Sequence, residues 1–109
     1  MADSAIVRAV QNYLAYVKKQ GVPVSYGVLF GSYAKNTAHE SSDIDVLVVS
    51  PRYDEAHTAE DYENLWMYAA RTDYRIEPIP VGEKQFKTDK NSMIIVIARR
   101  EGQIIPLAE

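Results

Sequence analysis

Apolar residues recur every three or four positions near the start of the chain, and this spacing predicts an amphipathic helix. Its buried stripe would consist of Ile6, Val10, Tyr13, Leu14 and Val17. Asp3 or Ser4 can cap the beginning of this helix, while Gly21 and Pro23 end it.

Three runs rich in β-branched and aromatic residues predict strands, at residues 24–30, 44–50 and 74–81. Pro51 stops the second run. The third run contains two prolines, which either shorten the strand or place it at a sheet edge, because proline donates no hydrogen bond to a neighbouring strand. Between the first two strands we expect one helical turn over residues 33–36.

A second amphipathic helix is predicted after the second strand. Thr58 is followed three residues later by Asp61, which resembles a capping box, and the helix would reach about Arg71. Its buried face would consist of Tyr62, Leu65, Trp66 and Ala69.

Residues 93–98 fit two alternatives. Their β-branched content is typical of a strand, but Asn91 and Ser92 can cap a helix and the following Gly102 can end one. We favour the helix, with a short strand at residues 103–105. The resulting order of elements predicts an α+β (mixed α/β) fold, in which helices flank a small sheet.

Composition narrows the function classes. At 109 residues, we expect a single domain over residues 1–109. The net charge of -3 argues against binding of long nucleic acid, and the lack of cysteine excludes disulfides and thiolate metal sites. The N-terminus does not resemble a signal peptide, and no apolar run approaches the ~20 residues of a membrane span. We therefore expect a cytoplasmic protein without membrane contact.

The main chemical signal is the pair Asp43 and Asp45, which lies on the second predicted strand. Residues i and i+2 of a strand face the same side, so the two carboxylates would project together. They repel each other unless a cation binds between them, and oxygen ligands select Mg²⁺ or Mn²⁺ over zinc. Two solvated acids at a strand edge are the plainer alternative.

A third carboxylate would strengthen the metal hypothesis. Glu77 lies among apolar residues of the third strand, and it could reach the same cation if that strand pairs with the second. Three acids on adjacent strands could hold two metal ions about 4 Å apart for phosphoryl transfer. Asp73 competes for this role, but it precedes the strand and fits a turn better.

Gly31 and Ser32 stand at the other end of the connection between the two strands. The glycine permits a tight turn and close approach of a ligand, and Ser32 offers a hydroxyl and an amide to an anion. Lys35 can add a positive charge. An anion site and a metal site on one connection suit a metal-chelated nucleoside triphosphate.

Residues 31–48, GSYAKNTAHESSDIDVLV, resemble the signature of the polymerase-beta-type nucleotidyltransferases, in which Gly-Ser precedes D-x-D by about ten residues. The chain is most similar to the minimal nucleotidyltransferases of bacteria and archaea. The resemblance implies a mixed sheet with helices and a two-metal transfer of a nucleoside monophosphate.

The same resemblance implies roles for individual residues. The metal ligands and catalytic acids would be Asp43, Asp45 and Glu77, with Glu77 also able to accept the proton of the attacking hydroxyl. The nucleotide-binding residues would be Gly31, Ser32, Lys35 and Ser42. The cofactor would be two Mg²⁺ ions, or Mn²⁺, and the preferred triphosphate is ATP.

Three functions remain open at this stage. The leading hypothesis is an enzyme that modifies a partner protein, as the antitoxin of a pair with a HEPN-type toxin. The second is a module that neutralises its toxin by contact alone. The third is a drug- or metabolite-modifying nucleotidyltransferase completed by homodimerisation. A D-x-D glycosyltransferase is least favoured, because the chain is short for a sugar-nucleotide domain.

Overall fold

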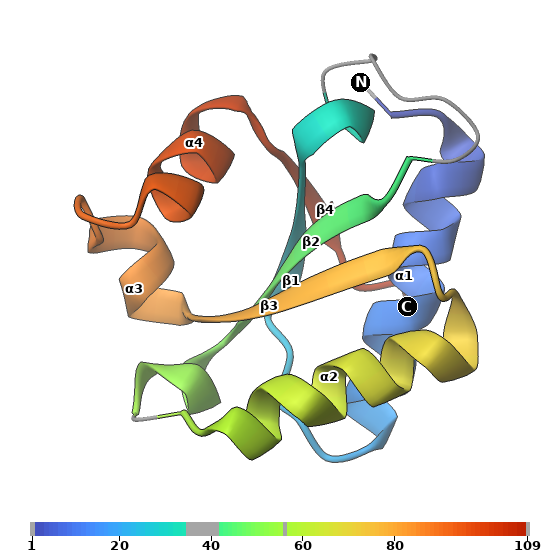
Figure 1. Cartoon of the computed structure of the whole chain (residues 1–109), viewed down its shortest axis with the longest axis horizontal. Helices are drawn as coiled ribbons and strands as arrows, with labels where there is room; N and C mark the ends of the chain where they lie inside the picture. The colour runs from blue at the N-terminus through green and yellow to red at the C-terminus, as the bar shows by residue number, and fades with distance from the viewer. Residues whose placement is uncertain (1, 35–41, 56, 109) are drawn as a thin grey trace.

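The computed structural model describes residues 2–34, 42–55 and 57–108 (Figure 1). The elements in chain order are α1 (Ser4–Lys19), β1 (Tyr26–Phe30), the 3-10 helix η1 (Gly31–Tyr33), β2 (Ile44–Ser50), the 3-10 helix η2 (Pro51–Asp54), α2 (Ala59–Thr72), β3 (Ile76–Gly82), α3 (Glu83–Thr88), α4 (Met93–Glu101) and β4 (Gln103–Pro106). Within these residues, no helix is long and apolar enough to cross a membrane.

The described strands form one four-stranded mixed sheet in the order β3-β2-β1-β4. β1 pairs antiparallel with both β2 and β4, whereas β2 and β3 run parallel. The fold is therefore a mixed α/β structure, as predicted. β3 lies at an edge of the sheet, where its prolines can be tolerated.

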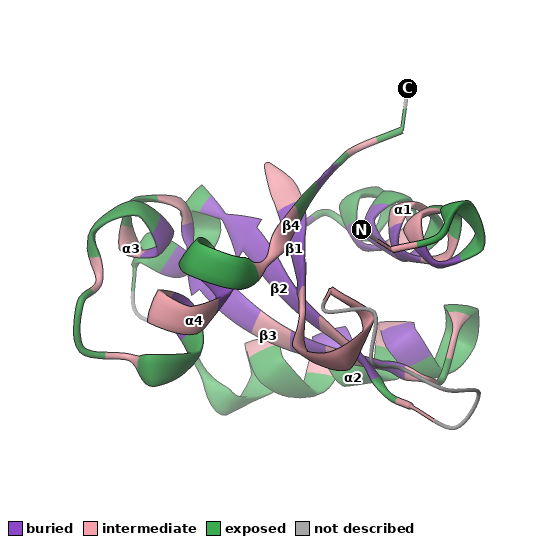
Figure 2. Cartoon of the chain, turned by 90° about the horizontal axis from the view of Figure 1, so that it is seen from above, coloured by how far each residue is buried: buried purple, intermediate pink, exposed green. Residues whose placement is uncertain are grey.

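Helices cover both faces of the sheet (Figure 2). One core joins α1 and α2 to alternate residues of β2, namely Ile44, Val46 and Val48. The other core joins α3 and α4 to the intervening residues Leu47 and Val49. Burial on both faces explains why β2 is a nearly continuous apolar run.

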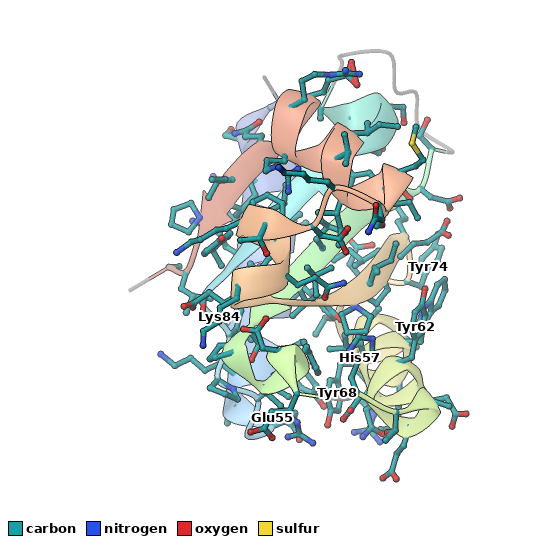
Figure 3. All side chains as sticks on the ribbon, turned by 90° about the vertical axis from the view of Figure 1, so that its left-hand side faces the viewer. Glu55, His57, Tyr62, Tyr68, Tyr74 and Lys84 are labelled. Atoms are coloured by element: carbon teal, nitrogen blue, oxygen red, sulfur yellow. The ribbon has the colours of Figure 1, made fainter. Side chains whose placement is uncertain are left out.

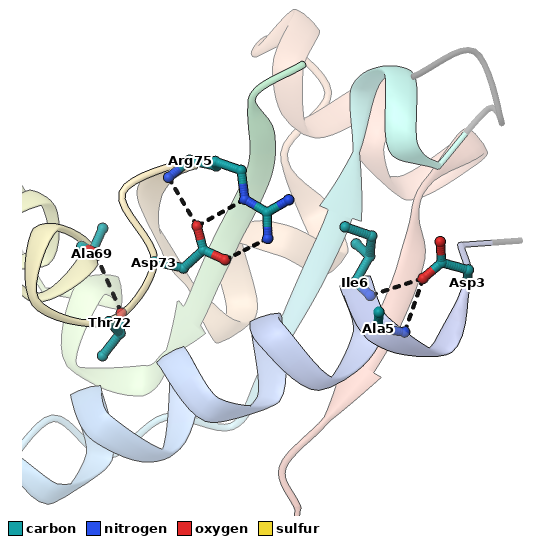
Figure 4. A network of polar contacts seen from close by, with 7 residues as sticks. All are labelled: Asp3, Ala5, Ile6, Ala69, Thr72, Asp73 and Arg75. Atoms are coloured by element: carbon teal, nitrogen blue, oxygen red, sulfur yellow. Dashed lines mark hydrogen bonds and ion pairs between the residues drawn. The ribbon is translucent and has the colours of Figure 1, made fainter. Parts of the chain in front are cut away.

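Several predicted elements are confirmed. Asp3 caps α1, where its carboxylate accepts hydrogen bonds from the amides of Ala5 and Ile6 at 2.9 and 3.1 Å (Figure 4). All five residues of the predicted α1 stripe are buried. The capping box of Thr58 and Asp61 is present at α2. Residues 93–98 lie in a helix, which decides between the two alternatives for that segment.

Other details of the prediction were wrong. Tyr62 and Trp66 are 39% and 40% exposed, because the sheet covers only the part of α2 that carries Leu65 and Ala69. Figure 3 shows Tyr62 and Tyr74 at the molecular surface. The 3-10 helix η1 begins at Gly31, two residues before the turn expected over residues 33–36, of which 35 and 36 lie outside the described residues. The helix α3 was not anticipated.

Candidate active site

Three chain segments meet at one corner of the sheet, where β1 ends and β2 and β3 begin. Asp45 is the Cα partner of Phe30 on one side and of Glu77 on the other. Asp43 lies two residues before Asp45, and Gly31 directly follows Phe30. The predicted pairing of the second and third strands is thus confirmed, and it places Glu77 beside the aspartates.

The acids face the side of the sheet that carries α3 and α4. Asp45 shares its face of β2 with Leu47, and Glu77 shares its face of β3 with Ile79 and Val81. Leu47 and Val81 are buried under α3 and α4, and Ile79 packs against them. The carboxylates therefore lie at the end of this apolar face. Asp45 and Glu77 are half-buried there, whereas Asp43 is exposed.

Close approach of the carboxylates changes their proton affinity. The pKa of Glu77 is raised from 4.5 to about 7, first by a hydrogen bond with the Asp43 carboxyl, then by burial and by the negative charges of Asp43 and Asp45. Burial, followed by the charge of Asp43, also raises the pKa of Asp45. Neighbouring carboxylates repel one another when all of them are ionised, and a bound cation would relieve this repulsion.

Gly31 brings the backbone of η1 against Asp45. Its φ of +76° lies in the region that disfavours side chains. A Cβ at this position would also collide with the Asp45 Oδ2 atom. Both constraints require glycine, and together they fix the start of η1 directly over the carboxylate.

The donor set suits a hard divalent cation, because it consists of carboxylate oxygens. Burial and mutual repulsion disfavour the charged forms of Asp45 and Glu77, and a bound cation would offset this cost. Among the described residues, however, no three His, Cys, Asp or Glu side chains are arranged so that they could hold a metal ion as they stand. Joint ligation of a cation by these three carboxylates would therefore require their side chains to reorient.

The other residues that the sequence offered for the site are Ser32, Ser42, Lys35 and the alternative third acid Asp73. Ser32 lies within η1 and Ser42 lies just before Asp43; both are half-buried and already engaged in contacts. Lys35 lies outside the described residues. Asp73, the competing third acid, pairs with Arg75 at 2.7 Å, and this pair holds the Asp73 pKa below its usual range.

Sequence reasoning overlooked Arg75, which stands two residues before Glu77. Its guanidinium pairs with both carboxylate oxygens of Asp73, at 3.0 and 2.7 Å. The spacing Asp73-x-Arg75 was a possible signal of this local ion pair.

Comparison with solved structures agrees with this architecture. The chain is similar to a protein of Sulfolobus solfataricus provisionally assigned as a nucleotidyltransferase, with a TM-score of 0.62, 16% identity, and coverage of 92% of this chain and 78% of that one. It is also similar to a chain from a toxin-antitoxin structure with AMP-PNP, with a TM-score of 0.60, 19% identity, and coverage of 91% and 74%. These likenesses show the fold. No curated protein matches the chain.

The family of the chain is shown by its match to a family model. Residues 11–102, well over half of the chain, match the family model described as nucleotidyltransferase domain. This match includes η1, both aspartates and Glu77. Members of this family are transferases that act on nucleotides and typically use divalent metals. The chain belongs to the nucleotidyltransferase domain family.

Proposed function

We propose that this enzyme transfers a nucleoside monophosphate, with AMP from ATP as the preferred case, to a hydroxyl group of a partner protein. The observation that carries the proposal is the group formed by Asp43, Asp45 and Glu77 beside η1. In this group the register of β2 and β3 sets Glu77 against Asp45, and Gly31 brings η1 onto the same carboxylate.

The proposed reaction is a displacement at the α-phosphorus. The acceptor oxygen forms a bond to phosphorus, the bond to the bridging oxygen of the β-phosphate breaks, and pyrophosphate leaves. Asp43, Asp45 and Glu77 would hold two Mg²⁺ ions, or Mn²⁺, which supply charge neutralisation for the triphosphate and the developing negative charge. Glu77 would accept the hydroxyl proton, since its carboxyl lies beside Asp45, where the metal ions would be held.

On this proposal the triphosphate is held at η1. Gly31 would allow close approach of the phosphates, and Ser32 and Ser42 would bind their oxygens. Lys35 is proposed as an additional phosphate contact. The assignments of Gly31, Ser32 and Ser42 rest on their position at the same corner of the sheet as the acids, whereas that of Lys35 rests on the sequence alone.

A partner protein is supported by two observations. Met93 and Ile94 of α4 and Ile104 of β4 are 69%, 45% and 57% exposed. Ile104 is paired with Val28, whose side chain packs with α4, so all three residues belong to the side of the sheet that the acids face. A fold likeness to a toxin-antitoxin component suggests the class of partner, and we propose a HEPN-type toxin.

The test uses ATP labelled at either the α- or the γ-phosphate, with Mg²⁺ and the product of the neighbouring reading frame. Nucleotidyl transfer leaves the α-label on the partner and releases the γ-label in pyrophosphate. Labelling by γ-ATP would instead indicate a kinase. The Asp43→Asn and Asp45→Asn variants are the negative controls, and the other three triphosphates measure nucleotide preference.

A second candidate is a module that binds its toxin without catalysis. The exposed apolar residues Met93, Ile94 and Ile104 favour it, because inhibition by contact needs a docking surface and no chemistry. Such a module would inhibit its partner equally well after the Asp45→Asn change. Loss of inhibition together with loss of labelling would reject it.

A further inference from the structure

The outward side of α2 exposes apolar side chains. Trp66 and Met67 are 40% and 42% exposed, and Ala70 is exposed as well. Met67 and Ala70 point away from Leu65 and Ala69, which are buried against the sheet. Because α2 packs on the face of the sheet opposite to α3 and α4, this outer surface is separate from the acid group and from the exposed part of α4 (Figure 2).

The exposed positions of α2 repeat as they do in paired helices. The residues Glu60, Glu63, Met67 and Ala70 are all exposed, and they are spaced by three, four and three positions. This is the heptad spacing of residues that face a second helix. The small side chain of Ala70 permits close approach of that helix, and Trp66 flanks Met67, where its ring would cover the contact. The outer side of α2 therefore has the form of one half of a helix–helix interface.

Charges on this surface are divided between its two ends. Glu60 and Glu63 lie in the first half of α2, whereas Arg71 lies in its last turn, and all three are exposed. Glu63 and Arg71 are eight positions apart, too far for the pairing of residues three or four apart on one helix. Each of them is four positions from Met67, on opposite sides of it. Two copies of α2 packed antiparallel about Met67 would therefore set Glu63 of each copy against Arg71 of the other.

Arg71 has hydrogen-bond donors to offer to a second copy. One terminal nitrogen donates to the hydroxyl of Tyr16 at 3.3 Å, at the exposed junction of α1 and α2. A guanidinium has five N–H donors, so this single bond leaves others for a carboxylate. Asp61, the other acid of the first turn, is already engaged in the capping box and in an ion pair with Arg52 at 3.2 Å. The acidic end of the outer surface thus consists of Glu60 and Glu63.

We propose that the outer side of α2 is an interface between two copies of this chain, which pair antiparallel about Met67. A second copy is the occupant that the charges favour, because the surface complements itself: it is acidic at one end, apolar at its centre and basic at the other end. The helix has 14 residues. Its length of about 21 Å gives a small interface, so the dimer should form reversibly at roughly 10–100 µM protein. Both acid groups and both α4 surfaces stay open in this dimer.

The experiment exchanges the charges across the interface and measures the dimer dissociation constant of the purified chain by sedimentation equilibrium. Glu63→Arg and Arg71→Glu each set two like charges against each other. The double variant restores opposite charges and keeps the net charge of -3. Two controls accompany them. Arg8→Glu reverses an exposed charge on α1, and Tyr16→Phe removes the hydroxyl that accepts from Arg71 within one copy.

Each single charge reversal on α2 should raise the dissociation constant roughly tenfold or more, and the double variant should return it to within a few-fold of the wild type. Both controls should dimerise as the wild type does. A wild type that stays monomeric up to several hundred micromolar, on the order of ten times the expected range, would overturn the inference. So would a double variant that fails to recover, or an Arg8→Glu variant weakened as much as Arg71→Glu. None of these outcomes depends on nucleotide transfer, so the inference stands or falls apart from the proposed function.

Discussion

At the scale of single residues, Asp43 and Asp45 should be required for metal and dispensable for folding. The raised pKa of Asp45 means that its charged form is disfavoured in the folded protein. A neutral side chain at this position therefore removes a contribution that lowers the free energy of unfolding. We expect Asp45→Asn to abolish Mg²⁺-dependent triphosphate binding while the melting temperature at neutral pH stays equal or rises. Calorimetric binding and thermal unfolding check this; a large drop in melting temperature would show that the acid is structural.

Glu77→Gln should separate chemistry from binding. The amide cannot accept the proton of the acceptor hydroxyl, whereas Asp43 and Asp45 remain to hold the metal that accompanies the triphosphate. We expect nucleotide affinity within a few-fold of wild type and turnover lower by roughly 10²-fold or more. Single-turnover labelling together with AMP-PNP titration measures the two effects, and near-normal turnover would remove Glu77 from the chemical step.

The proton on Glu77 also predicts how stability depends on pH without metal. The folded carboxyl releases its proton near pH 7, whereas the unfolded one releases it near 4.5. The folded state therefore binds more protons in this window, and the contribution of Glu77 to stability is lost as pH rises from about 4.5 through 7. Subtracting the melting curve of Glu77→Gln, measured over the same pH range, isolates this contribution. Parallel curves would contradict it, and Mg²⁺ should stabilise the wild type more at pH 8 than at pH 5.5.

At the scale of elements, the turn from β1 into η1 depends on Gly31. Gly31→Ala combines a positive φ with a clash against Asp45, whereas Gly21→Ala has a φ of +104° and nothing within 4 Å of the added Cβ. Both changes should cost about 1–2 kcal/mol from backbone conformation. Only Gly31→Ala should also weaken AMP-PNP binding, because it displaces η1 or Asp45. Equal nucleotide affinity in the two variants would show that this contact has no role in the site.

The elements that the sequence predicted well are those whose signals are local. β2 is an apolar run interrupted only by Asp45 before Ser50, it is stopped by Pro51, and its bounds match the prediction. The helix α3 was missed because its cap is remote: the Asp54 carboxylate accepts from the amides of Lys84 and Gln85, about 30 residues later in the chain. The position of Glu77 beside Asp45 needed only the pairing of two strands, while the contact of Gly31 with the Asp45 carboxylate required the whole arrangement of η1 against β2.

At the scale of the whole molecule, the direction of the carboxylates determines where a protein acceptor can approach. Asp45 and Glu77 face the side of the sheet covered by α3 and α4, so on the proposed function an acceptor hydroxyl would approach from that side. The exposed part of α4 contains apolar residues together with Arg99 and Arg100. An apolar patch beside positive charge fits a partner surface that is apolar at its centre and acidic at its margin.

This geometry predicts that substitutions at Ile94 and Met67 will differ in their effect on partner binding, although the two side chains are similarly exposed, at 45% and 42%. Ile94 is on α4, on the side that the acids face, whereas Met67 is on α2, which packs on the opposite face. An acidic side chain at either position leaves both cores intact, so neither change should lower stability greatly. Ile94→Glu should weaken the complex with the co-expressed neighbour roughly tenfold or more and reduce labelling in parallel, because a charge would be desolvated at the contact. Met67→Glu should do neither. The measurement is the size of the complex during titration with the purified partner. Loss of binding in Met67→Glu alone would place the partner on α2. A monomer that does not bind the product of the neighbouring reading frame would favour a small-molecule acceptor.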